Sequence, residues 1–234
     1  MQALAQTSRR AHCAQVALQG HRRPRARPVA CRAASSAKSR VREAVDSGCD
    51  VYSDLIGLES DIKALIAENP TSSPGYSASE IGQGSWQVFS APHIAGFSKP
   101  VGIRFSPIRY HLDGSRISSN VRFEGKLPGV GKVAGWLSAA GTFSYEDDTT
   151  VRVDFNDFWY DPDESLRMDV DSASRAAARS SADNVITQMG RLAFFPQFSK
   201  FPVLYLDDDI CVFKFPPLDS AIACARIKAL PEGR

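Results

Sequence analysis

The first 42 residues contain no acidic side chain. They carry ten Lys and Arg residues, whereas the rest of the chain carries eighteen basic and twenty-six acidic residues, a formal charge of −8. The overall charge of +2 therefore averages two regions of opposite character. The negative charge of residues 43–234 repels phosphate backbones. The basic region has no interleaved aromatic residues for base stacking, so we do not expect the protein to bind nucleic acid.

Long apolar runs are also missing. The longest in the basic region is Val16-Ala17-Leu18, too short for the apolar core of a secretory signal. A basic, Ala/Ser-rich, acid-free start is typical of an organelle transit peptide, and Val29-Ala30-Cys31-Arg32-Ala33 looks like a plastid processing site. We expect residues 1–35 to be a cleaved plastid leader; a mitochondrial leader is the alternative. No later run approaches the length of a transmembrane helix, so membrane association is expected to be peripheral.

Histidine and cysteine are scarce after the leader. Only His93 and His111 remain, which leaves little material for a Ser-His-Asp triad or a multi-histidine metal site. Cys49, Cys211 and Cys224 have irregular spacing, typical of neither a disulfide framework nor a zinc site. Cys211 and Cys224 fall on neighbouring predicted strands and could pair, but we expect two separate core thiols. No cofactor and no metal are expected.

The first regular pattern after the basic region is a helical periodicity of apolar residues. Apolar residues recur at helical spacings from Val41 to Leu65, which predicts an amphipathic segment over residues 36–69 that Gly48 and Gly57 can divide. Asn69-Pro70 ends it. The Pro/Ser/Gly-rich residues 70–84 are expected to be a linker.

From Ser85 to Tyr160 the apolar period changes to two, as in half-buried antiparallel strands, with turn residues between them. A flexible Ser/Ala/Arg-rich stretch and a short helix over residues 183–192 are expected before the last strands. Short connections imply an up-and-down meander, and closure of such a sheet removes its edges. We therefore predict a mainly β protein, a lipocalin-like antiparallel barrel over residues 85–228, with a short tail at 229–234.

The last hairpin, Val203-Leu204-Tyr205-Leu206-Asp207-Asp208-Asp209-Ile210, resembles the C-terminal signature of the plastid lipid-associated proteins, or fibrillins. Asn69-Pro70-Thr71 and Gly84-Ser85-Trp86 extend the resemblance upstream. The shared motif residues are Tyr205, Leu206, Asp207 and Asp209. The chain departs from the family pattern at Cys211, where the family has Arg, and at Lys214-Phe215-Pro216-Pro217, where it has a basic residue and Gly. A role of that arginine cannot be carried over, and the chain looks like a divergent member.

The resemblance implies a non-catalytic protein of plastid thylakoids and plastoglobules that binds or organises lipids or isoprenoids. A small barrel can hold one apolar ligand, and its lining would come from aromatic residues, with Arg122 as a recognition group for a lipid head. The candidate ligand-binding residues are Trp86, Phe89, Arg122, Trp136, Phe158, Trp159 and Tyr205. Phe194 to Phe198 and Phe213 to Pro216 are candidates for contact with a lipid droplet, or for plugging the barrel end.

An enzyme is the alternative function, and two further motifs resemble functional sites. An enzyme, or a subunit of one, acting on a lipid-derived or isoprenoid substrate inside the barrel would need a buried carboxylate beside an apolar pocket. Asp207 to Asp209 could bind a cation, although a turn with solvated charges is the expected structure. Gly129-Val130-Gly131-Lys132 imitates part of a phosphate-binding loop, but Val133 follows where Ser or Thr is needed, so a Gly-rich hairpin is expected.

Overall fold

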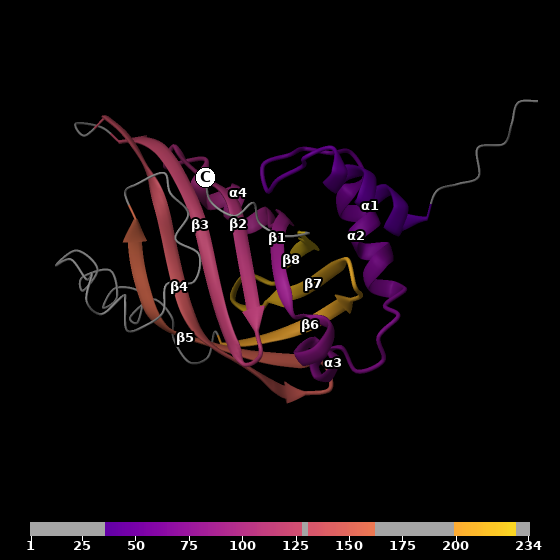
Figure 1. Ribbon diagram of the computed structural model, residues 1–234. Coiled ribbons are helices and arrows are strands. Elements are labelled where there is room, and N and C mark those ends of the chain that lie inside the picture. The colour runs from indigo at the N-terminus through magenta and orange to yellow at the C-terminus, as the bar shows by residue number, and fades with distance from the viewer. Residues whose placement is uncertain (1–35, 128–130, 162–198, 228–234) are drawn as a thin grey trace, which may run out of the picture. The chain divides into compact units, whose positions relative to one another are not determined.

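The computed structural model describes residues 36–127, 131–161 and 199–227. Eight antiparallel strands form a closed barrel in which each strand pairs with its neighbours along the chain and β1 pairs with β8 (Figure 1). The strands are β1 Gly84–Ser90, β2 Ile103–Asp113, β3 Arg116–Leu127, β4 Gly131–Asp147, β5 Thr150–Asp161, β6 Lys200–Leu206, β7 Ile210–Phe215 and β8 Ser220–Arg226. The predicted lipocalin-like up-and-down barrel is confirmed. The predicted short helix at 183–192 lies outside the described residues.

Two helices, α1 Ala37–Asp46 and α2 Leu58–Ala67, form where the sequence predicts one amphipathic segment. Gly48 and Gly57 lie between them with φ of 82° and 89°, a backbone region that glycine adopts without a steric penalty. Apolar side chains of both helices share one core cluster with outward-facing residues of the barrel, among them Phe89 and Tyr205. The predicted apolar stripe fails at Leu55, which lies in the connection between the helices and is 41% exposed.

The predicted linker at residues 70–84 is wrong in part, because it contains the helix α3, Pro74–Ile81. Proline suits the first helical position, where its missing N–H would have no partner in any case. Gly75 approaches the β4–β5 turn closely and its amide donates to the Asp148 carbonyl at 2.8 Å. A second helix, α4 Pro92–Ser98, lies between β1 and β2, where the sequence predicts only turn residues.

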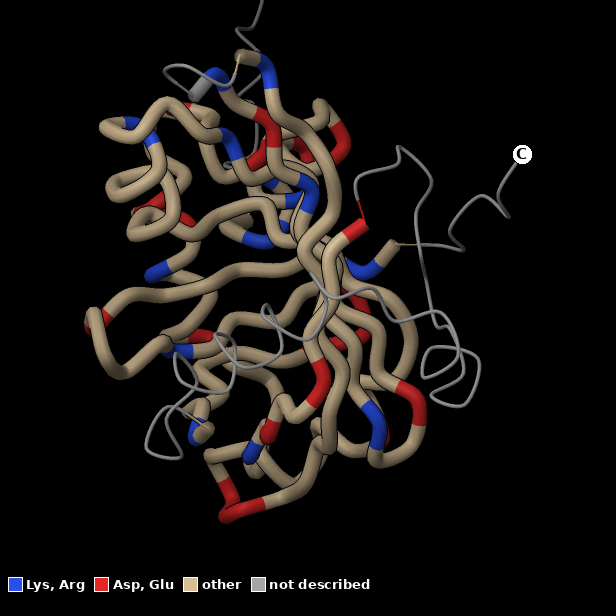
Figure 2. Tube along the Cα trace, turned by 90° about the vertical axis from the view of Figure 1, so that its left-hand side faces the viewer, with Lys and Arg blue, Asp and Glu red and all other residues tan. Residues whose placement is uncertain are grey.

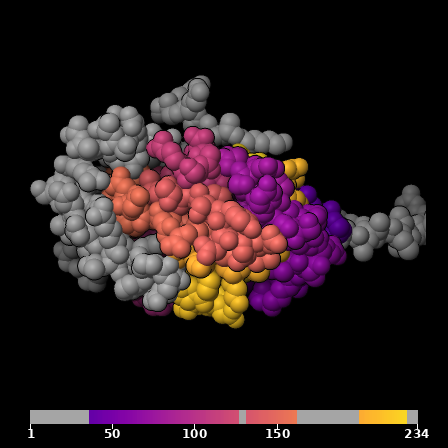
Figure 3. All heavy atoms as spheres, turned by 90° about the horizontal axis from the view of Figure 1, so that it is seen from below, coloured from indigo at the N-terminus to yellow at the C-terminus, as the bar shows by residue number. Residues whose placement is uncertain are grey.

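Helix α3 lies at one end of the barrel and is held there by β1 and β8. The indole N–H of Trp86 donates to the Gly82 carbonyl at 2.7 Å, and Arg226 donates to the carbonyls of Ile81, Gln83 and Asp208. The Arg226 guanidinium also lies over the Trp86 ring, 4.3 Å from its centroid. Seen from below, the described residues form a continuous surface (Figure 3). We call this α3 end the closed end of the barrel.

The Asn69-Pro70-Thr71 segment is hydrogen-bonded to the last predicted hairpin. The Asn69 side-chain oxygen accepts from the Leu206 amide at 3.2 Å, and the Thr71 hydroxyl donates to the Leu206 carbonyl at 2.6 Å. These two side chains satisfy both backbone groups of Leu206 at the end of β6. Two of the three sequence motifs that carry the family resemblance, Asn69-Pro70-Thr71 and the last hairpin, therefore contact each other directly.

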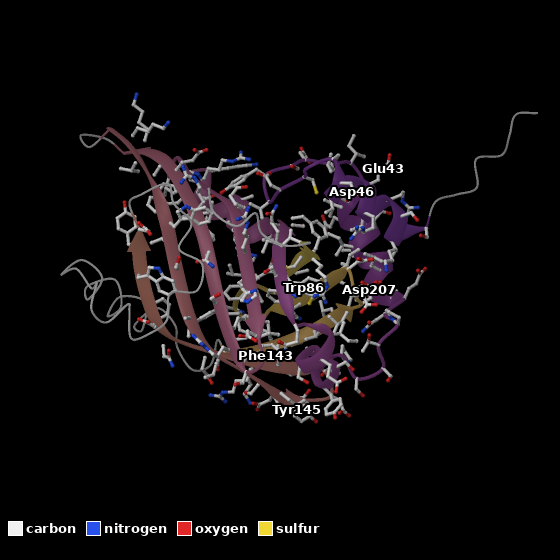
Figure 4. All side chains as sticks on the ribbon, viewed as in Figure 1. Glu43, Asp46, Trp86, Phe143, Tyr145 and Asp207 are labelled. Carbon is white, nitrogen blue, oxygen red and sulfur yellow. The ribbon has the colours of Figure 1, made fainter. Side chains whose placement is uncertain are left out.

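The acidic turn between β6 and β7 is paired with α1 rather than solvated, which corrects the expectation from the sequence. Lys38 Nζ lies 2.7 Å from Asp207 Oδ2, and an Arg42 nitrogen lies 3.4 Å from Asp209 Oδ1. Asp207 is labelled beside the helices in Figure 4, and Figure 2 shows the charges along the chain. Lys38, Arg40 and Arg42, grouped by composition with the basic leader, thus belong to the folded domain. Residues 36–234 carry twenty-one basic against twenty-six acidic side chains, a formal charge of −5.

We expect the attachment of α1 to weaken in acid. Burial raises the pKa of Asp207, but hydrogen bonds from Lys38, Tyr205 and the amides of Asp209 and Ile210 outweigh burial and lower its pKa below the ordinary value. A carboxylate with a lowered folded pKa stabilises the fold above its unfolded pKa of about 3.9, and this stability is lost as the pH falls through the folded pKa.

Hydrogen exchange of the α1 amides should therefore accelerate as the pH is lowered from about 5 to below about 3, after correction for the intrinsic rate. The Asp207→Asn variant, which cannot titrate, should show faster α1 exchange already at neutral pH and no further acid step from this site. An unchanged α1 protection in this variant would show that the ion pair does not hold the helix.

Candidate ligand cavity

The interior of the barrel holds a partly open cavity of about 270 Å³. All eight strands contribute to its lining. On β2, β3, β5, β7 and β8 the lining residues are two positions apart, because side chains of a strand alternate between the two faces of the sheet. Helices α3 and α4 contribute Ala78 and Ile94 from the two ends. Figure 4 labels two of the lining residues, Trp86 and Phe143. The volume is near the lower end of the range for ligand pockets, which suits one small apolar molecule or one end of a longer lipid.

Aromatic rings form a connected row along the cavity wall. Tyr110 and Phe213 meet at a centroid distance of 6.0 Å, Phe213 and Phe201 at 5.9 Å, and Phe201 and Phe215 at 6.4 Å. His93 of α4 then stacks on Phe215 at 5.1 Å. Such edge-to-face and stacked contacts stabilise the rings beyond their area of burial. The row gives the cavity a continuous aromatic wall.

Polar groups on the lining are few and uncharged. His93 Nδ1 is hydrogen-bonded to the Ser220 hydroxyl at 2.9 Å, and burial lowers the pKa of His93, which favours the neutral ring at pH 7. Tyr110 and Ser119 add two hydroxyls, and burial raises the pKa of the Tyr110 phenol. No Asp, Glu, Lys or Arg belongs to the lining within the described ranges. The carboxylate that the enzyme interpretation needs is thus absent from this part of the wall, and that interpretation stays a prediction.

Cys211 and Cys224 face each other across the β7–β8 ladder and both line the cavity. Both thiols are free, as expected from the sequence. Burial raises the pKa of Cys211 to about 12 and also raises that of Cys224, so both are protonated at neutral pH. A protonated thiol is a poor nucleophile and metal ligand, and these residues behave as small apolar wall groups.

Only one of the predicted ligand-binding residues, Trp86, lines the cavity. Phe89 and Tyr205 face the outside of the barrel, against α1 and α2. Phe89 lies three positions after the inward-facing Trp86, so regular alternation places it outside, whereas Tyr205 is turned outward by a pairing irregularity in β6. Tyr205 donates to Asp207 and therefore has a structural role in the acidic turn. Leu206 lines the cavity instead, fully buried.

Arg122, Trp136 and Trp159 belong to the opposite face of the sheet. In the β3–β4 register Arg122 pairs with Trp136 and Ser119 pairs with Ala139, so Arg122 and the cavity-lining Ser119 have opposite orientations. Trp159 pairs with Ser138 on the same outer face as Trp136, and the Arg122 guanidinium lies 5.8 Å from the Trp136 ring centroid. Phe158 has the inward register beside Ala139 but does not belong to the cavity lining.

Most of the cavity wall lies outside the predicted ligand-binding set, including Tyr110, Phe143, Phe201 and Val203. For three of them the available signal was alternation, since Tyr110 is two positions from the lining residue Leu112, and Phe201 and Val203 are two positions apart. Phe213 and Phe215, predicted as droplet contacts or plugs, are lining residues. Phe194 to Phe198 lie outside the described residues.

Within the described ranges, the residues form neither the cation site nor the phosphate-binding loop that the sequence allows. Asp207 and Asp209 are paired with basic side chains, and no group of three or more His, Cys, Asp or Glu residues there is placed to hold a metal ion. Gly131 and Lys132 begin strand β4, as expected of a hairpin. Within the same ranges, no helix has the length and hydropathy needed to cross a bilayer.

In comparisons with known proteins, no family model and no curated protein matches the chain.

Proposed function

We propose that this protein binds one neutral lipid or isoprenoid molecule inside the barrel and performs no chemistry on it. The observation that carries the proposal is the apolar cavity inside the barrel, whose described lining has no charged residue. Such a cavity favours apolar ligands, because transfer of each methylene group from water contributes about 0.8 kcal/mol. Charged ligands are disfavoured, since burial of an unpaired ion is costly.

The resemblance of the last hairpin to the plastid lipid-associated proteins supports a lipid ligand of plastid origin. The Arg-rich, acid-free leader supports delivery to that organelle. We therefore propose that the protein acts at the surface of thylakoids or plastoglobules, from which it would draw its ligand.

The direct test is native mass spectrometry of the full chain after incubation with a total plastid lipid extract, followed by solvent extraction of the bound species. We expect retention of one lipid class at one molecule per chain. If the protein retains no lipid, the proposal is wrong. A charged lipid as the dominant species would also contradict it.

Filling the cavity should weaken ligand binding without unfolding the protein. Val203 is 5% exposed and points into the cavity, so a phenyl ring in the variant Val203→Phe would occupy ligand volume. We expect the affinity for a neutral fluorescent probe, N-phenyl-1-naphthylamine, to fall at least roughly tenfold. The matched control is Thr142→Phe, which adds an aromatic ring at an exposed position of β4 next to the lining residue Phe143. Equal probe affinity in the two variants would place binding elsewhere.

A further inference from the structure

Tyr110 and Ser119 are neighbours inside the cavity. They face each other across the β2–β3 ladder and both belong to the lining. Directly opposite residues of an antiparallel pair have Cβ atoms about 5 Å apart, so the phenol and the hydroxyl belong to one patch of the wall. Around them the lining is apolar, with Trp86 opposite Tyr110 on β1 and Phe213 at its ring edge.

Neither hydroxyl has a hydrogen-bond partner among the described side chains and backbone groups. This distinguishes them from the other polar groups nearby: Trp86 donates to Gly82, and His93 is bonded to Ser220. Polar groups in an apolar interior normally find a partner, because an unpaired one forfeits roughly 1–3 kcal/mol. Two hydroxyls on the wall of an apolar cavity therefore indicate a partner that enters the cavity.

We propose that the cavity selects a neutral ligand with a hydrogen-bonding oxygen, such as a ketone, quinone or alcohol, and that the Tyr110 hydroxyl donates to that oxygen. This inference rests on the proposed function and names the ligand class. Ser119 supplies a second hydroxyl on the same wall. The carbon skeleton of the ligand then packs against the aromatic row from Phe213 to Phe215.

The polar groups of the wall disfavour two related classes of ligand, fatty-acid carboxylates and pure hydrocarbons. A fatty-acid carboxylate would need a cation, and the described lining offers none; Arg226 lies over Trp86 but is directed to the carbonyls of α3 and the β6–β7 turn. A pure hydrocarbon would leave both hydroxyls unpaired. Burial also raises the pKa of Tyr110, so its phenol remains a hydrogen-bond donor throughout the physiological pH range.

The test is displacement of N-phenyl-1-naphthylamine from the full chain by octane, octan-1-ol, 2-octanone and octanoate, which share one chain length. We expect 2-octanone and octan-1-ol to bind more tightly than octane and octanoate. In Tyr110→Phe, the affinity for the ketone and the alcohol should fall roughly threefold to tenfold while that for octane is unchanged. The matched control is Tyr76→Phe, because Tyr76 is 57% exposed on α3.

The possible failures are distinct. If no competitor displaces the probe and no lipid is retained from the extract, the proposed function itself fails. If octane and 2-octanone bind equally well, or Tyr110→Phe lowers the affinity for both to the same extent, the cavity binds lipids but Tyr110 does not recognise a ligand oxygen. Preference for octanoate would overturn the assignment of a neutral ligand. Unchanged circular dichroism spectra and unfolding midpoints in Tyr110→Phe exclude a folding defect as the cause of weaker binding.

Discussion

Replacement of Gly141 by alanine should lower the free energy of unfolding by about 3 kcal/mol or more. A Cβ at this position would lie 2.0 Å from the Asp154 carbonyl oxygen and 2.7 Å from the Phe155 Cα. Both neighbours are backbone atoms of β5, so no side-chain rotation can relieve the clash. Strand β5 would have to move away from β4, which breaks the ladder where Val153 and Phe155 form the cavity wall.

The matched control is Gly96→Ala in α4. A Cβ there meets nothing within 4 Å, and alanine is favoured over glycine in a helix by up to about 1 kcal/mol. Urea unfolding followed by circular dichroism should therefore give a much lower midpoint for Gly141→Ala and an equal or higher one for Gly96→Ala. Equal midpoints in the wild type and Gly141→Ala would mean that β4 and β5 do not approach as closely as described.

The second large effect is expected at Arg226. In Arg226→Met the aliphatic stem is kept, but the guanidinium hydrogen bonds to Ile81, Gln83 and Asp208 and the contact with Trp86 are lost. Hydrogen bonds from a charged donor contribute about 1.5–3 kcal/mol each when they are not replaced by water. Because water can bind some of these carbonyls again at the barrel end, we expect the free energy of unfolding of Arg226→Met to fall by about 2–3 kcal/mol.

Arg152→Met is the comparison, because Arg152 forms ion pairs with Glu146 and Asp154 at the surface and has a side-chain exposure of 36%. Exposed pairs of this kind contribute at most about 1 kcal/mol. Near-UV circular dichroism should report a changed Trp86 environment in Arg226→Met only. If both variants unfold at the same urea concentration, the hydrogen bonds of Arg226 do not hold α3 against the barrel.

The sequence predicts the barrel well because alternation and turn residues are local properties. Which side chains enter the cavity is not local. The pairing irregularity between Val203 and Tyr205 reverses the alternation in β6, so Tyr205 faces α1 and α2. Phe89 faces the same helices because it lies three positions after the inward-facing Trp86. The outward orientation of Trp136 depends on its register with Arg122, which only the folded sheet reveals. Aromatic content alone therefore selected the wrong wall residues.

Helix α3 shows a different limit. Its sequence is rich in Pro, Ser and Gly, which intrinsic propensity assigns to loops. The helix is stabilised by its place in the fold, since Arg226 and Trp86 satisfy carbonyls at its end and Gly75 allows close approach to the β4–β5 turn. Similarly, the charge of Lys38 and Arg42 resembles that of the leader, and only their partners Asp207 and Asp209 identify them as part of the domain.

The β1–β8 ladder joins the first strand of the barrel to the last, with Trp86 paired to Arg226. During synthesis, β1 leaves the ribosome long before its partner exists, and until β8 follows, β1 and β7 are both open edges. Open edges recruit other strands, and contacts between distant residues slow folding. A chain that ends before Ser220 can therefore neither close the sheet nor fix α3, and we expect it to associate with other chains or to remain bound to a chaperone.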